Sequence, residues 1–484
     1  MELTPAQALG GWASELSFEQ LPRELVDGIR LHVLDTLAVA IAGASSDGGN
    51  AALAVARGAG RGSEASIVGT RGRGRTALVA LVNGAYAHAL DFDDTHLPSL
   101  MHPSASIVPA VLAQGEASGA AGPELVVALA VGYEVACRLA MAQHDTSRSR
   151  SLFFERGLHA TSILGTVAAA AACAKLRRLG PEGIANAIAV ACSMGAGIIE
   201  SNRTGGSVKQ IHAGLAAHSA VLAADLVSCG LTGAPTALEG RFGLFRALCG
   251  DEWDAGALTS ELGDKWWFYD IAIKPYPCNH FTHALVDAAH ALRLRGLRPQ
   301  DVEHVSIGTA TSSLRTIGQP IEEKRAPSSP YTAKFSGPFV FATALVGGGG
   351  LGVTSDDFSP VALSDPERLR IASVSDVCAD PACDEVFPFE LPATVRVATR
   401  DGGELEERVM HTRGSRRNPL AEHELAIKVA AAAGERADAL EDVCGRLEFL
   451  SDARLLIEST IPTRRKARVG GAAALDKLQR SQAT

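Results

Sequence analysis

Residues 88–106 concentrate ionisable groups between two apolar segments. The stretch holds three aspartates, three histidines and several hydroxyls: Asp91, Asp93, Asp94, His88, His96, His102, Thr95, Ser99, Ser104 and Ser106. Alanine, valine and leucine dominate on both sides, which favours burial. Buried ionisable groups are costly unless they are paired or used in chemistry. The stretch therefore predicts a functional polar cluster at the edge of a core or, as the simpler alternative, an inter-helix loop with capping Asp and Thr residues.

The first half of the chain predicts one helix after another. Thr4-Pro5 is typical of a helix start, and an apolar stripe of helical period runs from about Leu21 to Gly43. Residues 157–179 and 213–229 are alanine-rich and indicate buried helices. Aromatic residues make up only 5% of the chain while glycine is abundant, which favours closely packed helices. A chain of 484 residues is too long for a single core, so we expect more than one domain.

The pattern of apolar and polar residues changes after about residue 269. Residues 271–274 and 302–307 alternate as half-exposed strands do, and residues 393–398 and 404–409 flank Asp401-Gly402 as a hairpin. Helices are predicted at 282–294 and 332–345, and helical texture resumes after Pro419. We therefore expect a mainly α protein: a multihelical domain from residues 1–270 and 412–465, an inserted α+β lid domain at 271–411, and a frayed tail at 466–484.

Composition argues against several classes of partner. The net charge is −9 and the basic residues are scattered, so nucleic acid is not expected as a partner. Apolar runs are interrupted before they reach membrane-spanning length, so no membrane contact is expected. Nine cysteines lack any CxxC spacing, which argues against a zinc site. Their odd number and the lack of a signal peptide pattern predict reduced thiols and a cytoplasmic location.

Three further segments carry candidate chemistry. His159 opens an apolar helix, where the helix dipole lowers imidazole basicity; a capped structural histidine is the alternative. Lys209 follows a glycine-rich turn and suits a substrate carboxylate, or else is a surface lysine. His280 and His283 are three residues apart beside two prolines, without an HExxH motif or a nearby acidic residue. The sequence therefore predicts no metal site, and no nucleotide or flavin fingerprint is present.

Six segments in this order resemble the motif blocks of the MmgE/PrpD family. They read HALDFDDTHLPSLMHPSASIVPA, GLHATSILGTVAAAAA, VKQIHAGLAAHSAVLAADLVSCGLTGAPTALEGRFGLF, KPYPCNHFTHALVDAA, AKFSGPFVFATAL and RGSRRNPL. The resemblance covers nearly the whole chain. The family includes 2-methylcitrate dehydratase, cis-aconitate decarboxylase and iminodisuccinate epimerase. The resemblance implies a helical domain with an inserted lid, a cofactor-free enzyme and a homodimer.

The resemblance also implies roles for individual residues. The expected catalytic residues are His102, His159, Lys209, Asp91 and His283. The expected substrate-binding residues are Thr95, His280 as a second candidate beside His283, Asp94 and Ser104 of the acidic stretch, and Tyr331 as the residue that could substitute for a tyrosine missing farther along the chain. One departure stands in the AKFS block, where family members commonly carry a tyrosine and this chain has Phe339.

All three family reactions occur at a carbon next to carboxylates. Histidine and lysine suit them because they bind anions, stabilise developing negative charge and move protons near neutral pH. We expect a lyase that acts on a citrate-like polycarboxylate. The reaction we expect first is the dehydration of a 2-hydroxy tricarboxylate. Decarboxylation of cis-aconitate and epimerisation of a succinate derivative are the alternatives. An inactive dimeric binding protein is the alternative from another class, suggested by Phe339.

Overall fold

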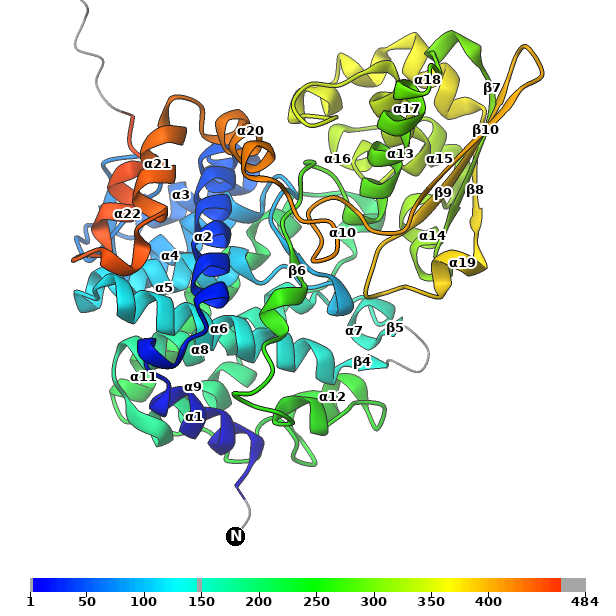
Figure 1. Cartoon of the computed structure of the whole chain (residues 1–484). Helices are drawn as coiled ribbons and strands as arrows, with labels where there is room; N and C mark the ends of the chain where they lie inside the picture. Colours follow the sequence, from blue (N-terminus) through cyan, green and yellow to red (C-terminus); the bar gives the residue numbers. More distant parts are fainter. Residues whose placement is uncertain (1–2, 146–149, 463–484) are drawn as a thin grey trace, which may run out of the picture.

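The computed structural model describes residues 3–145 and 150–462, and it is mainly helical, as predicted (Figure 1). The helices of the N-terminal half surround one large apolar core. At its centre lies α8 (Ala160–Leu176), which packs against α5 (Ser104–Ser118), α6 (Gly122–Ala142), α9 (Gly180–Cys192) and α11 (His212–Ser228). Nearly every residue of α8 is buried, because its alanines let four helices approach closely. The predicted tail at 466–484 lies outside the described residues.

The helix α4 (Thr76–His88) packs closely against α11. A Cβ atom added at Gly84 would lie 2.7 Å from the Cα of Gly214, so only glycine fits at this crossing. The helix α6 and residues Val208–Ser228 are each long and apolar enough to cross a membrane. The apolar part of α6 is wholly buried inside the protein, whereas that of residues Val208–Ser228 is half buried.

The C-terminal helices return to this first core. Leu425 and Val429 of α20 (Glu422–Ala433) and Leu440 of α21 (Ala437–Cys444) are buried in it. A fully buried ion pair between Lys428 and Asp35 joins α20 to α2 (Arg23–Gly43). Figure 1 shows these red-orange helices against the blue α2. The first core is thus built from both ends of the described chain.

A second apolar core lies around a four-stranded sheet. The strand order is β10 (Glu404–Val409), β9 (Ala393–Thr399), β7 (Val302–Thr309) and β8 (Ser375–Ala379). The strands β9 and β10 form the predicted antiparallel hairpin, while β8 runs parallel to β7. The helices α13 (His283–Leu294) and α17 (Gly337–Val346) pack together beside the sheet. The exact domain boundaries and the description of this part as a lid remain predictions.

The prediction of a single helix at 332–345 is wrong, because the structure has two separate helices there. The helix α16 (Pro330–Ala333) ends at Lys334, and α17 begins again at Gly337. Ser336 caps the new helix by accepting a hydrogen bond from the backbone N–H of Phe339, and Pro338 follows within its first turn. The break places Lys334 between the two helices, facing the first core's loops.

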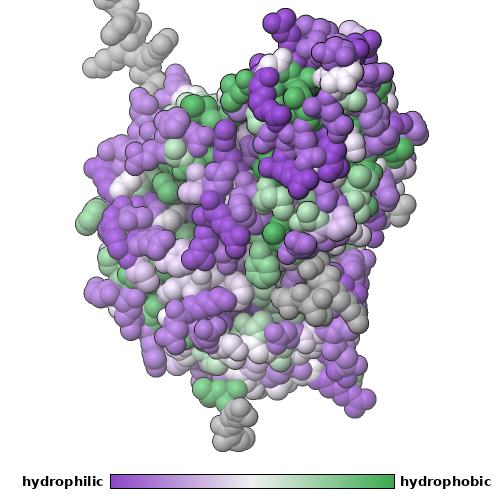
Figure 2. All heavy atoms as spheres, turned by 45° about the vertical axis from the view of Figure 1, so that its right-hand side comes forward, coloured by the Kyte–Doolittle hydropathy of each residue, from purple (hydrophilic) through white to green (hydrophobic). Residues whose placement is uncertain are grey.

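Two chain segments connect the two cores and lie side by side. The strand β6 (Ile271–Ala272) pairs antiparallel with β3 (Thr95–His96), inside the acidic stretch found in the sequence. The backbone N–H of Ile273 donates to the carbonyl of Gly414 on the returning segment, at 3.2 Å. The acidic stretch therefore lies where the chain passes from one core to the other. On the face drawn in Figure 2, hydrophilic side chains cover most of both lobes, and hydrophobic ones form small groups between them.

The remaining elements are short or peripheral. The helices are α1 (Pro5–Glu15), α3 (Asp47–Gly58), α7 (Leu152–Glu155), α10 (Ser201–Thr204), α12 (Leu244–Cys249), α14 (Thr311–Ile317), α15 (Ile321–Arg325), α18 (Pro366–Ser373), α19 (Pro381–Asp384) and α22 (Arg454–Ser459). The strands are β1 (Ala65–Ser66), β2 (Arg73–Gly74), β4 (His144–Asp145) and β5 (Arg150–Ser151).

Candidate active site

A pocket opens where the two cores meet. Its lining includes Thr95, Ser99, Leu100, His102, Ser151, Phe154, Leu158, His159, Ala160, Ile199, Asn202, Lys209, Asn279, His280, Phe281 and Phe335. Most of these residues come from loops and helix starts around the first core, and the last four come from the segments that lead into the second. The structure thus brings His102, His159 and Lys209, which are far apart in sequence, onto one pocket.

His102 lines this pocket as a neutral base. Its Nδ1 lies 2.7 Å from the backbone oxygen of Asp94, and a carbonyl oxygen only accepts, so Nδ1 carries the proton. The Nε2 atom is then left with a lone pair. Burial, together with the nearby Lys274, lowers the pKa of His102 to about 4. The ring is therefore uncharged and held in one tautomer at neutral pH.

His159 stands at the N-terminus of α8, as expected. Its Nδ1 lies 2.9 Å from Nδ1 of His212, and its ring lies 5.4 Å from that of His88. Burial and these neighbouring imidazoles hold the pKa of His159 well below its usual value. The rings of His88 and His212 therefore lie beside His159 at one end of the pocket, and no sequence pattern had assigned a role to either of them.

Lys209 supplies the positive charge on this wall. Its Nζ lies 3.3 Å from Oδ2 of Asp91 and 5.6 Å from the ring centre of Phe335. Asp91 is buried and not itself on the pocket wall. Burial alone would raise its pKa, but Lys209 and Lys274 hold that pKa well below the usual range. One carboxylate is thus shared by two ammonium groups, and Lys209 keeps a positive charge available to an anion.

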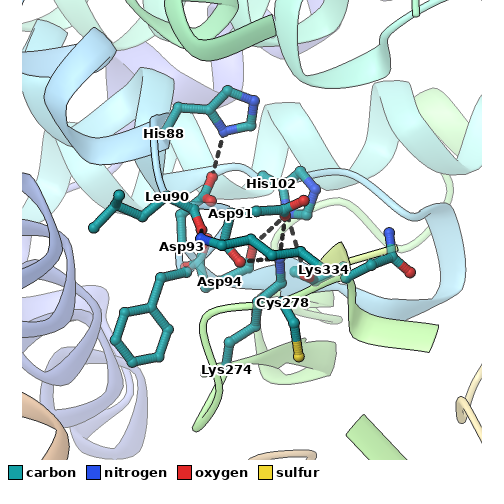
Figure 3. A network of polar contacts seen from close by, with 12 residues as sticks. His88, Leu90, Asp91, Asp93, Asp94, His102, Lys274, Cys278 and Lys334 are labelled. Carbon is teal, nitrogen blue, oxygen red and sulfur yellow. Dashed lines mark hydrogen bonds and ion pairs between the residues drawn. The ribbon is translucent and has the colours of Figure 1, made fainter. Parts of the chain in front are cut away.

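Lys274 and Lys334 support the acidic loop from behind the pocket wall, and the sequence patterns assigned neither of them a role. Figure 3 shows both side chains reaching the acidic loop from segments beyond residue 270. Lys274 is completely buried; its Nζ lies 2.6 Å from Oδ1 of Asp91 and 3.0 Å from the Asp91 carbonyl oxygen. The Nζ of Lys334 donates to the carbonyl of Leu90 at 2.8 Å, and burial lowers its pKa to about 8. Both lysines lie within the segments that resemble the family motifs. The feature that could have pointed to them is a basic side chain in a segment that is otherwise rich in apolar residues.

Of the two candidates at the start of α13, His280 lines the pocket. It is 4% exposed, and neither of its ring nitrogens has a hydrogen-bond partner among the described residues. Buried polar atoms without partners in a pocket wall are atoms that a ligand can satisfy. His283 stacks behind it at 4.3 Å between ring centres and lies within hydrogen-bond distance of the Cys278 carbonyl through Nε2. His283 is therefore not part of the pocket lining, and its catalytic role stays a prediction.

Three other expected substrate-binding residues also lie outside the pocket lining. Asp94 contacts Nδ1 of His32 at 2.6 Å and accepts from the hydroxyl of Ser104, so both belong to a buried network behind the loop. Asp94 and Ser104 therefore stabilise the loop, because their side chains already take part in hydrogen bonds within the protein. The hydroxyl of Tyr331 donates to Oδ1 of Asn202 at 2.9 Å, which places it one contact behind the wall. Thr95 does line the pocket and contacts His102 Nδ1 at 3.1 Å.

The departure at Phe339 has no effect on this pocket. The side chain is wholly buried in the second core, among other apolar residues. Phe339 is not among the residues that line the pocket. Among the parts of the chain that the structure describes, no three His, Cys, Asp or Glu side chains come together as metal ligands would.

Comparison with known proteins identifies the family. The MmgE/PrpD N-terminal domain model matches residues 7–255, and the MmgE/PrpD C-terminal domain model matches residues 276–444. A cis-aconitate decarboxylase of Aspergillus terreus is 25% identical over 471 residues, covering 92% of this chain and 94% of the relative. The human cis-aconitate decarboxylase is 28% identical over 397 residues, 78% of each chain. A cis-aconitate decarboxylase-like protein of Aspergillus oryzae is 23% identical over 374 residues, 73% of this chain and 75% of the relative. The chain belongs to the MmgE/PrpD family.

Proposed function

We propose that this protein is a lyase acting on a citrate-like polycarboxylate, and that it decarboxylates an aconitate-type substrate. The observation that carries the proposal is the meeting of Lys209, His102 and His159 on one pocket. The choice of decarboxylation over dehydration, the reaction first expected, follows the relatives, which are named cis-aconitate decarboxylases and align over most of this chain.

Binding of the substrate would depend on Lys209 and His280. Lys209 offers an ammonium group to one carboxylate, since Lys274 offsets the charge of Asp91 behind it. His280 offers ring nitrogens that have no partner within the described protein. Because water is largely excluded from buried walls, these contacts are stronger than the same contacts at an exposed surface.

Decarboxylation requires one bond to break and one proton to be delivered. The bond between the departing carboxylate and its carbon breaks, carbon dioxide leaves, and the electron pair spreads through the alkene toward the remaining carboxylates. A proton then adds to the alkene carbon at the far end of this three-carbon unit, and the double bond moves to the carbon that lost its carboxylate. A bound polyanion favours the charged imidazole, so substrate binding raises the pKa of His102, and the ring can take a proton from water and deliver it.

Dehydration of a 2-hydroxy tricarboxylate is the second candidate. The neutral His102, with Nδ1 tied to the Asp94 carbonyl, leaves Nε2 as the acceptor for a proton on carbon. The hydroxyl leaves as water after taking a proton from a second group; His159 lines the same pocket and can serve if the bound polyanion raises its pKa so that the ring is protonated. Cofactor independence and the homodimer belong to the same proposal, and they come from the family resemblance.

Carbon-13 NMR of the purified protein with cis-aconitate, citrate and 2-methylcitrate in deuterated water tests the proposal. Decarboxylation of a carbon-13-labelled substrate gives labelled carbon dioxide and a product with a deuterated methylene group. Dehydration gives a new alkene. Epimerisation gives deuterium uptake into the substrate without net loss of substrate. Release of carbon dioxide from the aconitate-type compound is the expected result. If substrates of all these types bind but none reacts, the inactive binding protein is the better account.

A further inference from the structure

The pocket holds little positive charge for a ligand with several carboxylates. Among the described residues that line it, Lys209 is the one permanent cation, and its ammonium group is shared with Asp91. Burial and neighbouring positive charges hold the pKa of His102 and of His159 below the usual value, so both rings are neutral before a ligand binds. The further carboxylates of such a ligand therefore need neutral hydrogen-bond donors on the pocket wall.

Asn202 lines the pocket and carries such a donor. Its side-chain oxygen Oδ1 accepts a hydrogen bond from the hydroxyl of Tyr331 at 2.9 Å. The oxygen and the nitrogen of an amide point in different directions from one carbon, so the bond that holds Oδ1 also sets where Nδ2 points. Among the described residues, no group accepts a hydrogen bond from Nδ2 of Asn202. This NH₂ group is therefore available to an anion in the pocket.

The hydroxyl that fixes this amide comes from a segment of the second core. Tyr331 belongs to α16, whose Ala333 is buried in that core, whereas Asn202 belongs to α10. The ring of Tyr331 packs against that of Phe335 at 4.9 Å between centres, and Phe335 lies on the pocket wall 5.6 Å from Nζ of Lys209. One short segment thus contacts both anion-binding side chains, one through a hydroxyl and the other through a ring face.

We infer that Asn202 is a substrate-binding residue that donates through Nδ2 to a carboxylate of the substrate, and that Tyr331 is a positioning residue that acts through Asn202. The inference rests on the proposed function and adds an uncharged carboxylate subsite to the charged one at Lys209. A hydrogen bond from a neutral donor to an ionised acceptor is stronger than one between two neutral groups, so this contact contributes to affinity without a further cation. The subsite is built by segments of both cores.

Two changes at Asn202 test the binding role. Asn202→Ala removes the donor, and Asn202→Asp keeps the shape of the side chain but replaces the donor by a charged acceptor. We expect KM for a turned-over polycarboxylate to rise by about tenfold in the first variant and by about a hundredfold in the second, with a smaller change in kcat. Asn50→Asp adds the same charge at an exposed site on α3 and should leave KM unaltered. An unaltered KM in folded Asn202→Asp protein would overturn the inference.

A double-variant cycle tests the positioning role of Tyr331. Tyr331→Phe removes only the hydroxyl, and we expect KM to rise by about threefold or more while kcat stays near normal. In the Asn202→Ala background the same change should have no further effect, because the hydroxyl acts through Asn202. Tyr269→Phe, at a tyrosine outside this pocket, is the matched control and should leave KM unaltered. Equal effects of Tyr331→Phe in both backgrounds would show that the hydroxyl does not act through Asn202.

Calorimetric titration with propane-1,2,3-tricarboxylate separates this inference from the proposed function. If the wild-type protein binds the compound and Asn202→Ala binds it about tenfold more weakly, the subsite is supported without any turnover. Equal affinity in the two proteins would overturn the subsite and leave the proposed function intact. Lack of binding to the wild type, together with lack of turnover of every polycarboxylate, would instead contradict the proposed function.

Discussion

The Nζ atom of Lys274 lies 2.6 Å from Oδ1 of Asp91, and both side chains are buried. Lys274 belongs to the segment that leaves the first core, and Asp91 belongs to the acidic loop. Asp91 has a positive φ of 55°, a conformation that few residues other than glycine adopt, so surrounding contacts must hold it there. The ion pair thus fixes the loop that carries Thr95 and His102.

Removal of Lys274 should destabilise the protein. Lys274→Met leaves Asp91 buried with only the longer contact to Lys209, and breaking a buried pair in this way costs about 3–5 kcal/mol. Urea denaturation measures the loss in the free energy of unfolding. The double variant Lys274→Met with Asp91→Asn should recover part of it, because no uncompensated charge remains. Equal stability of wild type and Lys274→Met would contradict this role of the pair.

Removal of the His102 imidazole should slow turnover. If Nε2 of this ring transfers the proton, His102→Gln should lower kcat by about a hundredfold or more. The same change at His218, a half-buried histidine outside the pocket, is the matched control and should have little effect. Steady-state rates with a turned-over polycarboxylate decide the point, and a near-normal kcat in His102→Gln would make the acidic loop purely structural.

Lys209 should matter for binding through its charge. We expect Lys209→Met to raise KM by about tenfold or more, and to lower kcat as well if the ammonium stabilises charge developing in the transition state. Lys265→Met, at an exposed lysine, should change neither constant. A Lys209→Met variant with an unaltered KM would remove Lys209 from the binding site.

Mild acid should destabilise the fold. Among the described residues, burial lowers the pKa of eight histidines: His96, His102, His144, His159, His212, His218, His280 and His283. In the unfolded chain histidine titrates near pH 6.5, about the usual value. Below that pH the unfolded state binds more protons than the folded state, so stability falls as pH falls from 6.5 toward 4.

Buried carboxyl groups oppose this effect. Burial raises the pKa of Glu134 to about 7, so the folded state takes up a proton there over the same range. Burial also raises the pKa of Asp35, Glu116, Asp225, Glu239, Asp287 and Glu390. Because the shifted histidines outnumber these carboxyl groups and titrate nearer neutral pH in the unfolded chain, the melting temperature should be lower at pH 5 than at pH 7.5, as thermal unfolding in two buffers would measure. A higher melting temperature at pH 5 would show that the histidines are not buried as neutral rings.

Activity should not depend on a divalent metal. The proposed proton transfers need only imidazole and ammonium groups, so exhaustive chelation should leave the rate unchanged. Loss of activity that returns only when a divalent ion is added would contradict the prediction.

Much of the fold could be predicted from local sequence patterns. Alanine-rich periodic segments predicted α8 and α11, and alternation around Asp401-Gly402 predicted the β9–β10 hairpin, because burial on one face leaves a regular signal. The break between α16 and α17 was missed because the capping role of Ser336 interrupts an apolar run without changing its hydrophobicity.

The site could be predicted only where its residues lie in the motif blocks that carry the resemblance. His102, His159 and Lys209 were found in this way, and the structure places all three on the pocket. Which of the two neighbouring histidines His280 and His283 faces the pocket depends on tertiary packing, so the sequence left this open; in the structure His280 lines the wall. Asp94 and Ser104 could not be told from substrate ligands because their partners, such as His32, are distant in sequence.

The most direct measurement of the central claim is calorimetric titration with propane-1,2,3-tricarboxylate, a saturated tricarboxylate that has no alkene and no hydroxyl to react. The account predicts binding to the wild-type protein at one site per chain. It also predicts that affinity falls by about tenfold or more in Lys209→Met and is unchanged in Lys265→Met, because only Lys209 faces the pocket. Equal affinity in all three proteins, or no binding to the wild type, would contradict a polycarboxylate site at this pocket.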